Sequence, residues 1–222
     1  MSHHTAAAAG AVEMTPEEEH HWSATGLDNR KVAIWTFIGS ECLFFASLIS
    51  TYLVYKGKSL VGPLPHTESQ CMLDGKMQTC AQIFEIPLVT FGTAVLLFSS
   101  FFVVLALYGA QKGDRKMLLT WLTATVVCGL FFVGMQVYEF YHFFHKGLGY
   151  STNLFGSTFY TLTGFHGTHV SLGVIWLTTM LVLAFRGKLP PEKSLNLEMA
   201  ALYWHFVDVV WIVIFPVVYL MR

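Results

Sequence analysis

Long apolar stretches separated by shorter polar connections dominate the pattern of hydrophobic and polar positions along the chain. Of its 27 charged side chains (13 Lys and Arg, 14 Asp and Glu), only Glu41, Glu139 and Asp208 lie inside these stretches. Each stretch exceeds the roughly 20 residues that an α-helix needs to cross about 30 Å of hydrocarbon, and a backbone in lipid must satisfy its own hydrogen bonds. We therefore predict an all-α, polytopic membrane protein with a bundle of five transmembrane helices, at about residues 32–55, 86–109, 117–141, 158–185 and 199–221.

Composition agrees with this pattern. Of the 222 residues, 54% are hydrophobic and 12% are charged, whereas a soluble globular chain carries roughly 25% charged residues. This shortage argues against a soluble enzyme and against a disordered chain, and the net charge of -1 provides no basic surface for nucleic acid. We expect a polar tail at residues 1–31, without the basic and apolar segments of a signal peptide, followed by one membrane domain at residues 32–222.

Basic residues in the connections predict the orientation. Eight of them fall on the side of the N-terminus and five on the opposite side, and the side richer in Lys and Arg faces the cytoplasm. The N-terminus is therefore predicted to be cytoplasmic and the C-terminus to lie outside. The eight are Arg30, Lys31, Lys112, Arg115, Lys116, Arg186, Lys188 and Lys193, and the five are Lys56, Lys58, Lys76, Lys146 and Arg222.

The predicted outer loop, residues 56–85, contains Cys71 and Cys80. An outer compartment is oxidising, and the other two cysteines, Cys42 and Cys128, lie inside apolar helices. We expect a disulfide between Cys71 and Cys80, with two free thiols as the alternative.

Ionisable groups inside the apolar stretches are the candidate functional residues, because placing one at mid-bilayer costs at least about 2.5 to 3.5 kcal/mol. Glu41 lies about 14 Å into its helix, near the predicted midplane. His166 and His169 are three residues apart, as are His205 and Asp208, so each pair shares one helix face. Each pair can satisfy its own polar groups or those of a neighbouring helix.

Four kinds of chemistry compete for these residues. Histidines could bind haem or a metal ion, although no second histidine pair occurs in a helix core. A di-iron bundle needs two Glu-x-x-His motifs on its helices, and Glu139 to His142 is the only one that begins inside the apolar stretches. A proton or ion relay would use Glu41, Asp208 and the histidines. Internal hydrogen bonds that lock helix packing are the fourth alternative, and the residues alone leave the choice open.

Two segments resemble the signatures of subunit III of haem-copper terminal oxidases. They are Gly156–Phe159 with Thr163–Val170, and Tyr203–Trp211. Further similar positions follow in the order of the family, namely Ser40–Glu41 with Leu43–Phe45, Thr93–Ser100, Gly129–Leu130, Gln136 and Glu139–Tyr141. The resemblance covers about residues 32–222.

The resemblance implies an accessory subunit without a catalytic or metal centre of its own. Haem and copper would belong to partner subunits I and II, and this chain would support the stability, lipid binding and proton uptake of the catalytic subunit of a proton-pumping oxidase in aerobic respiration. Glu41 matches the site of carboxylate-modifying reagents in the family. Gln136, Glu139, His166, His169, His205 and Asp208 would be buried polar packing residues. Arg186 is similarly placed to an arginine that contacts a lipid phosphate, with ordinary snorkelling as the alternative.

The chain resembles the five-helix bacterial form, which lacks the first two helices of the seven-helix form and with them one wall of the lipid-holding cleft. Another small subunit, a subunit IV, would have to supply that wall. The expected location is the bacterial plasma membrane, and the expected complex is a cytochrome c oxidase. The alternatives are a quinol oxidase or, from another class, a stand-alone membrane transporter.

Overall fold

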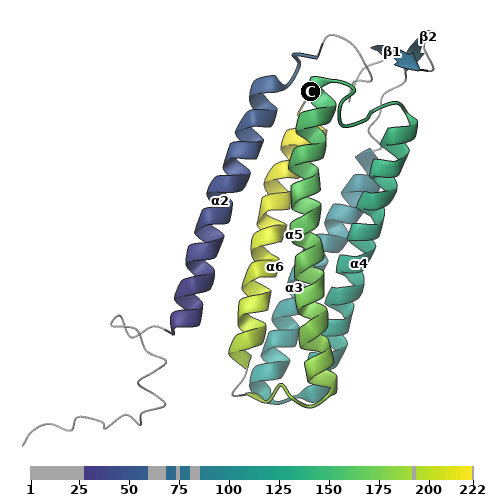
Figure 1. Cartoon of the computed structure of the whole chain (residues 1–222). Helices are drawn as coiled ribbons and strands as arrows, with labels where there is room; N and C mark the ends of the chain where they lie inside the picture. Colours follow the sequence, from purple (N-terminus) through teal and green to yellow (C-terminus); the bar gives the residue numbers. More distant parts are fainter. Residues whose placement is uncertain (1–27, 60–68, 74–75, 81–85, 192–193, 222) are drawn as a thin grey trace, which may run out of the picture. The chain divides into compact units, whose positions relative to one another are not determined.

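The computed structural model describes residues 28–59, 69–73, 76–80, 86–191 and 194–221, with only the backbone described for 69–80. Five long helices make up most of this part of the chain (Figure 1). They are α2 (Asn29–Tyr55), α3 (Ile86–Lys112), α4 (Arg115–His145), α5 (Leu154–Phe185) and α6 (Ser194–Phe215). All five are long and apolar enough to cross a membrane, which confirms the predicted number and class of elements.

The helices α2, α4, α5 and α6 begin earlier than the apolar pattern predicted, and polar side chains cap the first turns of α4 and α5. Asp114 caps α4 by accepting hydrogen bonds from the backbone N–H groups of Lys116 (3.0 Å) and Met117 (3.1 Å). Asn153 caps α5 by accepting one from Gly156 N (2.6 Å). Such side chains satisfy N–H groups that have no partner within the helix. The start of a helix is therefore marked by a capping residue rather than by hydrophobicity.

The helices α3 to α6 form a four-membered arrangement in which α3 and α5 each pack against both α4 and α6. At its centre, the Trp204 indole lies against Gly129 of α4 and Gly173 of α5. A Cβ atom at either glycine would approach an atom of the Trp204 ring to 2.8 Å. Trp204, Trp211 and Phe132 are among the largest fully buried side chains, so the core is built on α6.

The packing of the chain divides it after Phe37. On the N-terminal side, Asp28 Oδ1 accepts a hydrogen bond from Arg30 N (2.8 Å) at the start of α2. From Ile38 onward, the buried residues of α2 are Ile38, Phe45 and Tyr52. Their spacing of seven residues is that of a narrow helix–helix seam.

Aromatic contacts occupy this seam of α2. The ring of Phe45 lies 6.2 Å from Phe206 of α6 and 5.0 Å from His169 of α5, and Tyr52 lies 6.3 Å from Phe155. Just beyond α2, Lys56 Nζ donates a hydrogen bond to Met221 O (2.8 Å).

Two short elements were not predicted. The loop after α2 contains an antiparallel pair of strands, β1 (Ser69–Leu73) and β2 (Lys76–Cys80), with Cys71 opposite Gln78 and Cys80 opposite Ser69. The side chains of Cys71 and Cys80 lie outside the described residues, so the predicted disulfide stays a prediction. After α6, a π-helical segment, η2, covers Pro216–Leu220.

Candidate functional site

Glu41 and His169 meet between α2 and α5. His169 Nε2 lies 3.2 Å from Glu41 Oε2, and the two side chains are largely buried. His169 Nδ1 lies 2.8 Å from the carbonyl oxygen of Phe165 in its own helix. This contact requires a proton on Nδ1 and directs Nε2 toward Glu41. The pair therefore needs one further proton, either on the carboxyl group or on Nε2, to form its hydrogen bond.

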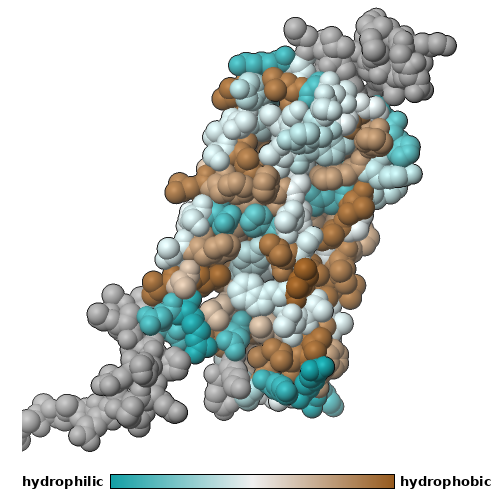
Figure 2. All heavy atoms as spheres, viewed as in Figure 1, coloured by the Kyte–Doolittle hydropathy of each residue, from teal (hydrophilic) through white to brown (hydrophobic). Residues whose placement is uncertain are grey.

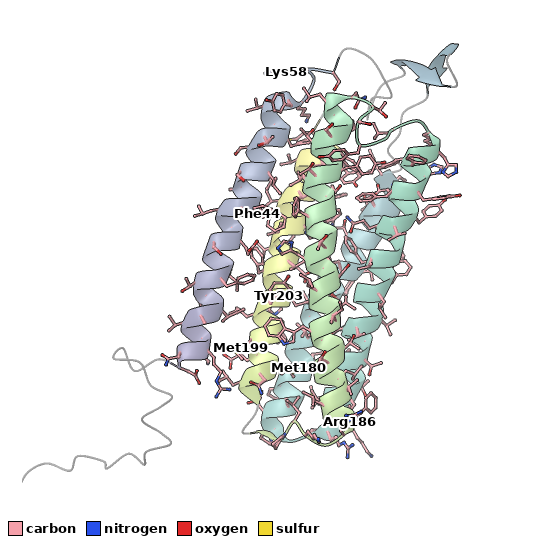
Figure 3. All side chains as sticks on the ribbon, viewed as in Figure 1. Phe44, Lys58, Met180, Arg186, Met199 and Tyr203 are labelled. Atoms are coloured by element: carbon pink, nitrogen blue, oxygen red, sulfur yellow. The ribbon has the colours of Figure 1, made fainter. Side chains whose placement is uncertain are left out.

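Aromatic groups enclose this pair. The Phe44 ring contacts that of Phe165 (5.2 Å), the Phe45 ring contacts that of His169, and Tyr203 of α6 donates to the carbonyl oxygen of His169 (3.2 Å). Figure 3 labels Phe44 on α2 and Tyr203 on α6. Three helices thus contribute to a small polar site surrounded by apolar side chains.

The His205 side chain bonds to α3. Ser100 Oγ forms a hydrogen bond with His205 Nδ1. Of the two arrangements open from the sequence, the structure shows for His205 the one in which a neighbouring helix supplies the partner. Neither carboxyl oxygen of the buried Asp208 has a hydrogen-bond partner among the described residues, so His205 and Asp208 do not bond to each other.

Two indoles of α6 extend the contacts with α3. Trp204 Nε1 donates to Ser99 Oγ (3.0 Å), and Trp211 Nε1 donates to Thr93 Oγ1 (2.9 Å). Sequence reasoning did not identify this ladder. The sequence feature that could have revealed these contacts is the seven-residue spacing of the two tryptophans, together with the small hydroxyl residues in the second apolar stretch.

His166 has surroundings different from those of His169. It is fully buried and stacked on Trp211, with ring centroids 4.7 Å apart, and the edges of Phe45 and Phe132 lie beside it. The two histidines therefore do not act as a pair of ligands. Within the residues that the structure describes, no three His, Cys, Asp or Glu side chains come together as a metal-binding group.

Glu139 and Gln136 are both buried on α4 but belong to different contacts. Tyr219 of η2 donates to Glu139 Oε2 (3.0 Å), and Gln136 Nε2 donates to the carbonyl oxygen of Thr163 in α5 (2.8 Å). Tyr219 could not be identified as a partner from the sequence, because its position depends on the π-helical segment.

Arg186 is exposed just after the end of α5 (Figure 3). The neighbouring Arg115 donates from Nη2 to the carbonyl oxygen of Phe185 (2.8 Å) and so caps the end of α5. Cations near a helix C-terminus are favourable because they complement its partial negative charge. Hydrophilic residues gather at this lower end of the face in Figure 2, while hydrophobic ones are spread over its middle.

Comparisons with known proteins agree on one family. The family described as cytochrome c oxidase subunit III matches residues 12–222. The chain is 38% identical to cytochrome c oxidase subunit 3 of Bacillus sp. strain PS3 (87% of this chain, 86% of the relative). It is 37% identical to quinol oxidase subunit 3 of Bacillus subtilis strain 168 (86% of each). It is 35% identical to cytochrome bo(3) ubiquinol oxidase subunit 3 of Pseudomonas aeruginosa (96% and 94%).

These relatives include both cytochrome c and quinol oxidases, at nearly equal identity. The match extends over almost all of the chain, including the helices α2 to α6 and the polar residues Glu41, His169, His205 and Asp208. The chain therefore belongs to the cytochrome c oxidase subunit III family, as a multi-pass membrane subunit of a haem-copper terminal oxidase complex.

Proposed function

We propose that this chain is the non-catalytic subunit III of a bacterial proton-pumping cytochrome c oxidase, in the plasma membrane with its N-terminus in the cytoplasm. Haem and copper would be held by subunits I and II. The observation that carries the proposal is that buried polar side chains form hydrogen bonds between helices of this chain. Glu41, Gln136 and Glu139 each bond to another element of the same chain, an arrangement that stabilises helix packing.

The polar pair Glu41–His169 is the point at which we expect this subunit to influence its partners. It ties α2 to α5 in the apolar interior, where a hydrogen bond between helices is worth about 0.6 to 2 kcal/mol. We propose that it keeps α2 docked during turnover and so sustains proton uptake by the catalytic subunit. A bound phospholipid would contact Arg186 through its phosphate group, and a small subunit IV would complete the cleft.

Purification of the oxidase from its native membrane tests this proposal. We expect the chain to copurify with a haem-copper subunit, and Glu41→Gln to assemble as well as the unchanged chain, because an amide still forms hydrogen bonds. Glu41→Ala should loosen the subunit and lower sustained activity. Full retention of the subunit, activity and lipid in Glu41→Ala would contradict the role given to the carboxyl group.

The electron donor needs a separate test. The family description and the relative from strain PS3 support cytochrome c. Oxygen uptake by the purified complex should therefore be driven by reduced cytochrome c. Uptake driven only by a quinol would assign the chain to a quinol oxidase and leave its accessory role unchanged.

Thiol labelling tests the outer loop. We expect Cys71 and Cys80 to react with a maleimide only after reduction, as a disulfide in an oxidising compartment would. Labelling of both residues without reductant would remove the proposed bridge.

A further inference from the structure

A groove follows the surface where α4 and α5 meet. It consists of two adjoining hollows of about 350 and 180 Å³, which share Gly164 and Thr168 of α5. Thr161 lines the first hollow and Ser171 the second. The α4–α5 groove, as we call it, therefore has a floor of small residues one turn apart.

No contact within the described part of the chain explains why residue 164 is a glycine. A Cβ atom at this position would meet nothing within 4 Å, although glycine in a helix is about 1 kcal/mol less favourable than alanine. Gly167 differs, because a Cβ there would meet Gln136 Oε1 at 2.7 Å. Gly167 thus makes room for Gln136, while Gly164 leaves open space in both hollows of the groove.

Gln136 supplies an independent observation. The residue is 6% exposed and lines the second hollow. Its Nε2 donates to the carbonyl oxygen of Thr163, whereas its Oε1 accepts no hydrogen bond from any described residue. Gln136 lies nine residues before the end of α4, about 14 Å along the helix and thus within the hydrocarbon. An acceptor without a donor is costly in that environment.

We propose that the α4–α5 groove docks a transmembrane helix of another subunit of the oxidase, and that this helix donates a hydrogen bond to Gln136 Oε1. Small residues let two helix backbones approach closely, and polar side chains bond across such contacts. A lipid acyl chain could fill the hollows but has no donor for Gln136. This inference rests on the proposed function, which makes the chain one of several membrane subunits.

Photo-crosslinking in native membranes that contain the complete oxidase tests which molecule occupies the α4–α5 groove. A benzophenone amino acid at Thr168 should form a covalent product with another oxidase subunit, identified by mass spectrometry. The matched control is Val127, which is 58% exposed on α4 and outside the groove, and which should not give this product. Products at Thr168 with lipid alone, or with a second copy of this chain, would overturn the proposal, as would the same subunit product at both positions.

Filling the groove provides the second test. Gly164→Leu should reduce retention of the subunit in the purified oxidase about tenfold, the factor that corresponds to about 1.4 kcal/mol. Gly134→Leu is the control, since a Cβ at Gly134 also meets nothing within 4 Å and Gly134 lies outside the groove. Equal retention of the two variants would contradict the proposal that a helix docks in the groove.

The two proposals fail in different ways. If the unchanged chain does not copurify with a haem-copper subunit, the proposed function is wrong. If it copurifies but Thr168 gives only lipid products, the function stands and the docking helix is wrong.

Discussion

Helices α2 and α6 differ in how they are used, although both are long and apolar and each carries an acidic residue, Glu41 or Asp208, within its length. Between Ile38 and Tyr55, three residues of α2 are buried, whereas eleven of the 22 residues of α6 are. The acidic group of α6, Asp208, is 2% exposed, while the side chain of Glu41 is 20% exposed.

Hydropathy does not determine which helix lies at the centre of the bundle. The apolar side chains of a helix in a bilayer can pack equally well against lipid or against protein, so apolar character alone does not select a central helix. The indole N–H groups of α6 bond to hydroxyl groups of α3, whereas α2 packs from Ile38 onward through one narrow seam beside the Glu41–His169 pair. The four predictions that follow compare a central helix with a peripheral one.

Removing the central indole should have the largest effect. Trp204→Ala leaves a cavity beside Gly129 and Gly173 and removes the hydrogen bond to Ser99. We expect a loss of about 3 to 5 kcal/mol in the free energy of unfolding in detergent micelles. Trp204→Phe, which keeps a ring at the site, should lose clearly less. Equal stability of Trp204→Ala and the unchanged chain would mean that α6 is not the centre of the core.

Adding a methyl group beside that indole should have the next largest effect. Gly173→Ala brings a Cβ to 2.8 Å from the Trp204 ring, and overpacking of this kind costs about 1 to 3 kcal/mol. The matched substitution Gly134→Ala, where the Cβ meets nothing within 4 Å, should be neutral or slightly stabilising. The midpoints of thermal unfolding should therefore separate the two variants.

Breaking the polar pair should affect α2 alone. Glu41→Ala removes the partner of His169 Nε2, at an expected cost of about 1 kcal/mol. Amide hydrogen exchange should become faster in α2 and stay unchanged in α3 to α6, and Glu41→Gln should restore most of the protection. Faster exchange throughout the bundle would show that α2 is as central as α6.

An exposed position on α2 should have the smallest effect. Leu43 is 75% exposed, so Leu43→Ala should change the free energy of unfolding of the isolated chain by less than about 0.5 kcal/mol. Phe45→Ala, two residues further and 2% exposed, serves as the buried comparison. A loss at Leu43 as large as that at Phe45 would contradict the narrow seam.

The number and class of the helices could be predicted from the sequence because each span must be apolar along its whole length. The strand pair β1–β2 could not, because it lies in a polar loop whose pairing depends on backbone register. In the candidate site, the residue types of Glu41, His169 and Asp208 drew attention because charge is rare in lipid. Ser100, Thr93 and Tyr219, which bond to His205, Trp211 and Glu139, did not, since such residues are common in composition and acquire their roles only through helix packing.

The π-helical segment at Pro216–Leu220 has a consequence for insertions and deletions. Pro216 has no N–H group to continue the α-helical ladder, and Met221 N bonds to Pro216 O five residues back (2.9 Å). The wider turn accommodates one more residue than an α-helical turn would. Removing one residue here would rotate all later side chains by about 100° and turn Tyr219 away from Glu139. This segment must therefore preserve its length as well as the Tyr219 hydroxyl group that bonds to Glu139.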